Sequence, residues 1–168
     1  MSAVEGGAYG LGLALATGSD YAVVAADAKL TCSFARIGLT ADTGLSYTLS
    51  ARVGPGRARE LILFAPVLTA QQARDQGLIS EVVPPGHALP VALERAHQIA
   101  AFSAPMVAAT KAILAHPDHD LESLLAAESA AQARLLAGAD FAEGRAAFFE
   151  RRPPRFTEPR PTTAQVRS

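Results

Sequence analysis

A glycine-rich run near the start of the chain is the first stretch whose residue types could support chemistry. Residues 6–12 have the sequence GGAYGLG and lead into an apolar segment, residues 10–18, that is predicted to be a short buried helix. Glycine lets the backbone turn sharply and lets a ligand approach closely. The first N–H groups of a helix have no partner inside the helix and, with the helix dipole, favour developing negative charge. The run is a candidate oxyanion hole, with a tight packing turn as the alternative; a dinucleotide-binding motif is disfavoured because Leu15 replaces its third glycine.

A single carboxylate between apolar flanks is the second candidate. Asp42 lies in the stretch IGLTADTG, just before a helix predicted over residues 45–53. A carboxyl group that apolar neighbours partly desolvate becomes a better proton acceptor near neutral pH. Asp42 is therefore a candidate general base. The alternative is a residue that caps the helix or closes an Asx turn, which is a common role for Asp at this place.

The sequence settings of the other potentially reactive residues indicate structural roles. His116 and His119 lie close together, but no further Cys, His or acidic cluster stands at metal-ligand spacing, so we interpret them as a turn between helices and expect no metal. Cys32 is the one cysteine, in a predicted strand without a nearby basic partner. That setting favours core packing over a nucleophile.

Three sections of different composition position these residues. Residues 1–86 mix glycine turns with short apolar runs, including predicted strands over 21–26 and 29–34, and indicate an α/β section. Residues 87–152 are predicted to form three alanine-rich amphipathic helices with leucines recurring on one face. Residues 153–168 hold four prolines and little apolar content, which predicts a disordered tail.

Composition and charge narrow the class of protein. The 168 residues carry 15 Lys and Arg against 16 Asp and Glu, a balance that gives no electrostatic reason to expect a nucleic acid or an anionic membrane as partner. No apolar run approaches the ~20 residues that a membrane span needs, and the N-terminus has no signal-peptide pattern. A single cysteine suits a reducing compartment. We expect a soluble, cytoplasmic protein that handles a small molecule or another protein.

Several stretches, taken in order, resemble the enoyl-CoA hydratase/isomerase (crotonase) superfamily. They are VEGGAYGLGLALA from Val4, SDYAVVA from Ser19, FARIGLTADTGLSY from Phe34, LTAQQARDQGLISEVVP from Leu68 and FFERRPPRF from Phe148. The resemblance implies an α/β fold: a crotonase-like (ClpP/crotonase) ββα spiral over residues 1–86, truncated at its start, followed by C-terminal helices for oligomerisation over 87–152. The ADTGLS stretch and the RRPPRF ending are most similar to the branch that contains the epoxyphenylacetyl-CoA isomerase of phenylacetate breakdown.

The resemblance also implies roles for individual residues of the first section. The backbone N–H of Leu11 falls where the family has its second oxyanion-hole donor. Asp42 falls on the proton-shuttling acid of that branch, with Ala41 in place of the usual proline. Hydratases use two glutamates, and Ala14 and Phe34 stand at those positions here. The pair that activates water is missing, so isomerisation is favoured over hydration.

Near the C-terminus, the family's F-x-x-K contact to the coenzyme A nucleotide falls on Phe148 and Arg151, and the family commonly offers this contact to a neighbouring subunit. Arginine keeps the charge but not the ammonium geometry of lysine. Coenzyme A would carry the substrate, and the resemblance implies no further cofactor. It also implies a homo-oligomer, a trimer or a hexamer.

The resemblance begins almost at the first residue. Family members have about a third of their chain before the motif that starts here at Val4, whereas three residues precede it in this sequence. In the family that N-terminal third supplies strands of the spiral, the first oxyanion donor and much of the coenzyme A pocket. Three interpretations follow: an incomplete sequence, half of a split enzyme that a second polypeptide completes, or a degenerate homologue.

Two functions stay open on the sequence. The first is an acyl-CoA isomerase of the enoyl-CoA or epoxyphenylacetyl-CoA type that works through a thioester enolate, with Asp42 moving the proton and the Leu11 N–H holding the enolate oxygen. The second is a non-catalytic acyl-CoA-binding or assembly subunit of a crotonase-like oligomer.

Overall fold

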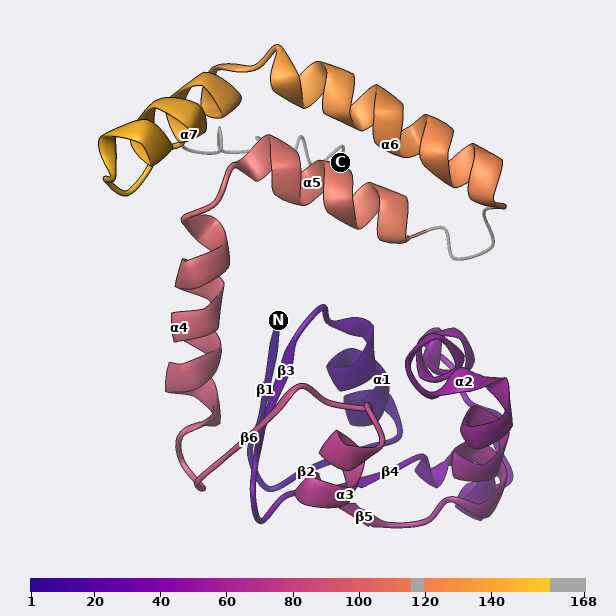
Figure 1. The fold of residues 1–168 in the computed structure, drawn as a ribbon. Coiled ribbons are helices and arrows are strands. Elements are labelled where there is room, and N and C mark those ends of the chain that lie inside the picture. The colour runs from indigo at the N-terminus through magenta and orange to yellow at the C-terminus, as the bar shows by residue number, and fades with distance from the viewer. Residues whose placement is uncertain (116–119, 158–168) are drawn as a thin grey trace, which may run out of the picture. The chain divides into compact units, whose positions relative to one another are not determined.

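The structure, a computed structural model, describes residues 1–115 and 120–157 and divides into two compact units (Figure 1). The first unit ends at Ala96 and the second begins at His97. The sequence places the change of section earlier, after residue 86. His116 and His119, interpreted above as a turn, lie outside the described residues.

Two small sheets form the centre of the first unit. One is parallel, with the strand order β1-β3-β6, and consists of β1 (Ser2–Val4), β3 (Ala22–Ala25) and β6 (Glu81–Val83). The other has the order β2-β4-β5 and consists of β2 (Gly7–Tyr9), β4 (Lys29–Thr31) and β5 (Leu68–Thr69). In the second sheet β2 and β4 run parallel, whereas β4 and β5 run antiparallel.

Helices cover these strands within the first unit. They include α1 (Leu11–Gly18), α2 (Leu45–Phe64), α3 (Ala70–Asp75) and the 3₁₀ helix η1 (Ser33–Ile37). Figure 1 shows α1 between the strands and α2, and α1 packs against both β2 and α2. Because α1 is apolar almost all round, it can be buried on two sides at once. Gly54, with φ 76° and ψ 159°, breaks α2 just before Pro55, where the sequence predicts that the helix ends.

The strand predicted over residues 29–34 is wrong at its C-terminal end. The strand stops at Thr31, and Ser33–Ile37 form η1 instead. The partner strand β2 ends at Tyr9, opposite Thr31, because the chain then enters α1. Beyond that point residues 32–34 have no β2 ladder to join. Cys32 lies in the core, only 2% exposed, and burial raises the pKa of its thiol, in agreement with the predicted packing role.

A partly buried arginine joins α1 to α2. Arg52 of α2 donates from Nε to the carbonyl of Thr17 at 2.7 Å and from Nη2 to the carbonyl of Ser19. These carbonyls belong to the last turn of α1 and the residue after it, where helical carbonyls lack partners within the helix. The contact therefore completes the C-terminus of α1 and fixes it against α2.

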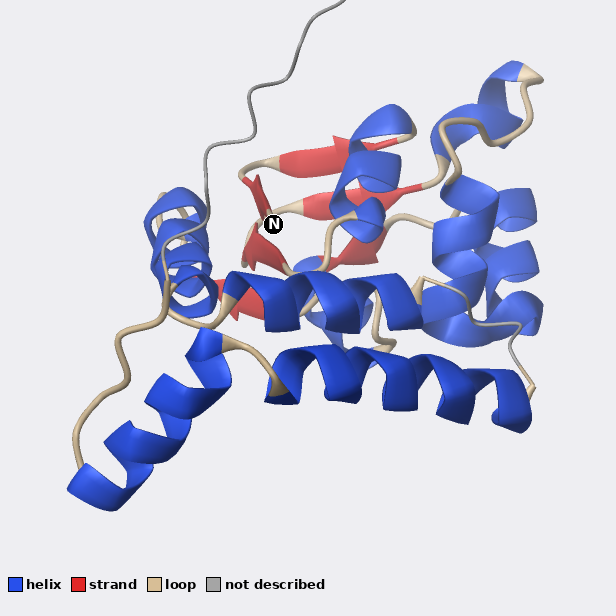
Figure 2. Ribbon diagram, turned by 90° about the horizontal axis from the view of Figure 1, so that it is seen from above, coloured by secondary structure: helices blue, strands red, loops and turns tan. Residues whose placement is uncertain are grey.

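The second unit is made of helices. They are the end of α4 (Ala88–Ala100), α5 (Ala104–Leu114), α6 (Leu121–Leu136) and α7 (Ala139–Glu150). Figures 1 and 2 show α5 and α6 side by side. The prediction of three helices over residues 87–152 is wrong, because the described residues of this range form four. Pro105 fits only the first turn of a helix, so α4 and α5 are separate, and Gly138 occupies the position before α7.

The chain turns back after α7. Arg151 ends the helix in the left-handed conformation, with φ 54°, and residues 152–157 return along α7. Residues 153–157, the first part of the predicted disordered tail, thus have defined contacts. The rest of that segment, 158–168, lies outside the described residues. Among the residues that the structure describes, every helix is too short or too polar to cross a lipid bilayer.

Candidate active site

The turn from β2 into α1 forms the candidate oxyanion site. Gly10 has φ 52° and ψ −111°, a conformation that residues with a side chain rarely adopt. Its N–H donates to the Thr31 carbonyl at 3.0 Å, and its carbonyl accepts from the Ala14 N–H at 3.1 Å. A Cβ at Gly10 would lie 3.3 Å from Ser33 Oγ and 3.5 Å from the Phe34 ring. Backbone conformation and crowding together require glycine here.

Leu11 follows as the first residue of α1. Its N–H therefore has no acceptor among the carbonyls of the helix, and it lies at the positive end of the helix dipole. The Leu11 side chain is 52% exposed, so the start of the helix lies at the surface of the unit. A ligand oxygen could accept a hydrogen bond from this N–H.

The two positions at which hydratases carry glutamates are apolar and differ in burial. Ala14 is 3% exposed in the core beneath the helix start, and the Phe34 side chain is half-buried beside Gly10. Neither position offers a carboxylate that could hold a water molecule.

Asp42 lies on the loop between η1 and α2, and it does not cap a helix. Gly44 occupies the N-cap position of α2 and no side chain caps that end. The Asp42 carbonyl accepts from the Leu45 N–H at 2.9 Å, while Oδ1 accepts from the Thr43 hydroxyl at 3.0 Å. The capping interpretation is therefore wrong for this side chain. The prediction that apolar neighbours partly desolvate the Asp42 carboxyl group is also wrong, because this side chain is exposed.

The residue after Asp42 has a strained backbone. Thr43 has φ 52°, in the left-handed region that a β-branched residue rarely enters. Such a conformation costs roughly 1–3 kcal/mol and is concentrated at functional sites. The neighbouring Gly44, at φ 75°, continues the same tight turn. The loop thus has a strained backbone position directly after the exposed carboxylate of Asp42.

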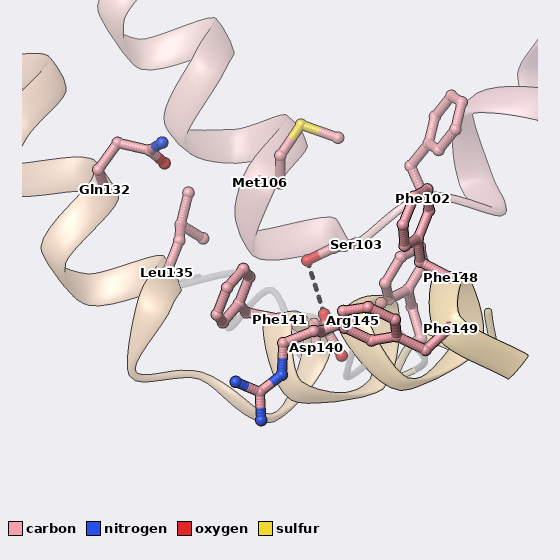
Figure 3. Close-up of a pocket in the computed structure, with 12 residues that line it drawn as sticks. Phe102, Ser103, Met106, Gln132, Leu135, Asp140, Phe141, Arg145, Phe148 and Phe149 are labelled. Atoms are coloured by element: carbon pink, nitrogen blue, oxygen red, sulfur yellow. Dashed lines mark hydrogen bonds between the residues drawn. The ribbon is translucent and has the colours of Figure 1, made fainter.

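Phe148 and Arg151, the predicted coenzyme A contacts, lie in the second unit. The Phe148 side chain is 78% exposed and packs edge-to-face on Phe149, with ring centroids 5.7 Å apart. Phe148 lines an open pocket of about 560 Å³ formed by aromatic and aliphatic side chains from α5, α6, α7 and the segments that flank them (Figure 3). Polar groups in the pocket wall include the Ser103 hydroxyl, which donates to Asp140 Oδ2 at 2.6 Å.

The predicted site residues thus fall in two groups. Leu11 begins α1 and Asp42 lies on the loop before α2, both in the first unit, whereas Phe148 and Arg151 lie in the second unit. Sequence reasoning missed Asp140 and Glu143. The available signal was a pair of acidic residues three apart on a predicted helix, followed by arginines at 151, 152 and 155.

A model of the enoyl-CoA hydratase/isomerase family matches residues 1–159. The chain belongs to this family. A relative from Rhodobacter capsulatus named "Probable enoyl-CoA hydratase" is 39% identical over 163 residues, which cover 94% of this chain and 62% of the relative. The 1,2-epoxyphenylacetyl-CoA isomerase of Escherichia coli K12 is 33% identical over 158 residues, covering 92% of this chain and 60% of that protein.

Solved structures agree on the fold. The crystal structure of an enoyl-CoA hydratase from Polaromonas sp. JS666 superposes with a TM-score of 0.87 at 32% identity, covering 91% of this chain and 60% of that one. The predicted family and the predicted crotonase-like α/β fold class are confirmed. This enoyl-CoA hydratase/isomerase chain spans less than two thirds of the length of each of these relatives. Both hydratases and an isomerase stand among the relatives, so similarity alone does not select the reaction.

Proposed function

We propose that this chain is an acyl-CoA isomerase, of the enoyl-CoA or epoxyphenylacetyl-CoA type, that works through a thioester enolate. The observation that carries the proposal is where acidic side chains stand, and do not stand, among the candidate catalytic positions. An exposed carboxylate, Asp42, stands on a strained loop and caps no helix, while Ala14 and Phe34 carry no acid at the hydratase positions. The E. coli relative named 1,2-epoxyphenylacetyl-CoA isomerase supports this branch, whereas the hydratase names among the relatives support the family only.

The proposed double-bond shift uses a base and an oxyanion donor from this chain. Asp42 removes a proton from the carbon next to the thioester carbonyl, and the electron pair moves to give an enolate oxygen. The Leu11 N–H donates a hydrogen bond to that oxygen, a contribution of about 2.7–4 kcal/mol for one such donor. Asp42 then returns the proton two carbons further along, so the double bond moves into conjugation. Coenzyme A acts as the carrier, and none of these steps needs a further cofactor.

Two substrates assayed in parallel test the reaction. Purified protein, alone and with the remaining part of a family chain supplied as a second polypeptide, is given a 3-enoyl-CoA and crotonyl-CoA. We expect isomerisation of the 3-enoyl-CoA and no appreciable hydration of crotonyl-CoA, because Ala14 and Phe34 offer no carboxylates to hold water at the hydratase positions. Robust hydration without isomerisation would overturn the proposed reaction and the placement of the site.

A second candidate is a non-catalytic acyl-CoA-binding or assembly subunit. The aromatic pocket and the exposed Phe148 in the second unit favour it. Saturable coenzyme A binding with no turnover of either substrate, even in the presence of the second polypeptide, would select this candidate.

A further inference from the structure

Two carboxylates of α7 hold the returning C-terminal segment. Asp140 Oδ1 accepts the Thr157 N–H at 2.9 Å, while its other oxygen accepts the Ser103 hydroxyl, the dashed line in Figure 3. Glu143 Oε1 accepts the Arg155 N–H at 2.7 Å. The Arg152 guanidinium donates to both Glu143 oxygens, at 2.6 and 3.0 Å. We call Asp140, Glu143 and residues 152–157 the C-terminal clamp.

The clamp forms part of the wall of the aromatic pocket. A Cβ at Gly144 would lie 3.5 Å from the Phe156 ring, so the ring packs directly on the bare backbone of α7. Phe156, Gly144 and Asp140 line the pocket together with Phe148. Release of residues 152–157 would therefore remove Phe156 from the pocket and open that side.

The clamp begins directly after the turn that holds Arg151. The Arg151 N–H donates to the Phe148 carbonyl at 3.3 Å, and the Arg152 N–H donates to the Ala147 carbonyl at 3.0 Å. This closing pattern accommodates the left-handed Arg151, a conformation that a residue other than glycine adopts at a cost of roughly 1–2 kcal/mol. Residues 152–157 follow directly on this turn, and Glu143 and Asp140 hold them against α7.

We propose that Asp140 and Glu143 are positioning residues, which hold residues 152–157 against α7 and thereby fix Phe148 and Arg151 for the nucleotide of coenzyme A. The inference rests on the proposed binding role of Phe148 and Arg151. Hydrogen bonds to a charged group are about twice as strong as neutral ones, and the bidentate contact with Arg152 adds directionality. Backbone amides at residues 155 and 157 are bound as well, so the clamp fixes the path of the chain and not only one side chain.

The experiment compares Asp140→Asn and Glu143→Gln with Glu150→Gln as the matched control. Glu150 also pairs with Arg152, through Nε, whereas the N–H groups of Arg155 and Thr157 are bound by Glu143 and Asp140. Coenzyme A affinity is measured by calorimetry on the full chain, together with amide hydrogen exchange and the melting temperature. We expect both clamp variants to weaken coenzyme A binding by about tenfold and to speed exchange at residues 155 and 157, with Glu150→Gln close to wild type.

The variant Phe148→Ala distinguishes the positioning role of the clamp from the binding role of Phe148. If Phe148→Ala weakens coenzyme A binding and the clamp variants do not, the positioning role is overturned while the proposed binding role stands. If Phe148→Ala leaves the affinity unchanged, or the wild type binds no coenzyme A, the binding role itself is contradicted and the inference with it. A clamp variant that exchanges faster at 155 and 157, keeps its melting temperature and binds coenzyme A as tightly as wild type also overturns the inference.

Discussion

Gly10 carries the backbone conformation on which the candidate oxyanion site depends. We expect Gly10→Ala to destabilise the protein by at least ~1–2 kcal/mol, because a Cβ opposes the φ of 52° and would lie 3.3 Å from Ser33 Oγ. Gly56→Ala is the control, because Gly56 lies in α2 with open space around a Cβ. This substitution should leave the free energy of unfolding unchanged or raise it by up to ~1 kcal/mol. Denaturant unfolding of both variants gives the comparison. Equal stability of Gly10→Ala and wild type would contradict the description of this turn.

Asp42 is expected to contribute little to stability, because its side chain caps no helix. Asp42→Ala should change the free energy of unfolding by no more than ~0.5 kcal/mol. Asp120→Ala is the matched control: Asp120 is the N-cap of α6 and accepts from the Ser123 N–H at 2.8 Å, so its loss should cost ~1 kcal/mol. If chemical denaturation shows Asp42→Ala to be as costly as Asp120→Ala, the carboxylate has a structural role that the described contacts do not include.

At the scale of residues, the sequence predicts unusual backbone conformations better than it predicts the roles of side chains. A glycine run before an apolar helix predicts a tight turn, and Gly10 shows the reason in its dihedral angles. The role of Asp42 could not be decided in the same way. Whether its side chain caps α2 depends on the φ of Thr43 and on the position of Gly44 as the N-cap residue. Asp140 was missed because its partners, Ser103 and Thr157, are distant in the sequence.

At the scale of elements, the attachment of the returning segment to α7 should depend on pH. Arg152 and then the Arg155 N–H lower the pKa of Glu143 from 4.5 to about 2, and the Ser103 hydroxyl lowers the pKa of Asp140. Because these folded-state values are depressed, the attachment is complete above pH 4.5 and is lost as the pH falls toward 2. Glu150 also faces Arg152 and offers it a second carboxylate.

The amide chemical shift of Arg155, followed by NMR during an acid titration, checks this dependence. We expect a transition below pH 4.5 in the wild type that Glu143→Gln removes. The same transition in wild type and variant would show that Glu143 is not the titrating group.

Element boundaries were predictable where one local rule decides them. Gly54 and Pro55 break α2 as predicted, because both residues oppose a helix regardless of their surroundings. The strand ending at Thr31 was not predictable from residues 29–34, since its length is decided by β2, which lies far earlier in the chain. The fourth helix was missed because alanine-rich sequence continues across the break near Ser103, and Pro105 was its main signal.

At the scale of the whole molecule, apolar side chains on the C-terminal helices predict self-association. Phe148 is 78% exposed, Phe149 76%, Leu121 70% and Leu125 51%. Surfaces of this kind on a soluble monomer are usually small, and larger ones mark interfaces. We expect sedimentation at micromolar concentration to show a homo-oligomer, a trimer or a hexamer. A well-behaved monomer under those conditions would contradict this expectation.

The most direct test of the proposed chemistry is the isomerase activity of Asp42→Asn in the assembled protein, with the second polypeptide present if turnover requires it. Asparagine preserves the shape of the side chain but cannot accept the substrate proton. If Asp42 is the proton shuttle, turnover of a 3-enoyl-CoA should fall by about 10²–10⁴-fold while the melting temperature stays near that of wild type. Unchanged turnover in Asp42→Asn would contradict the assignment of Asp42 as the catalytic base.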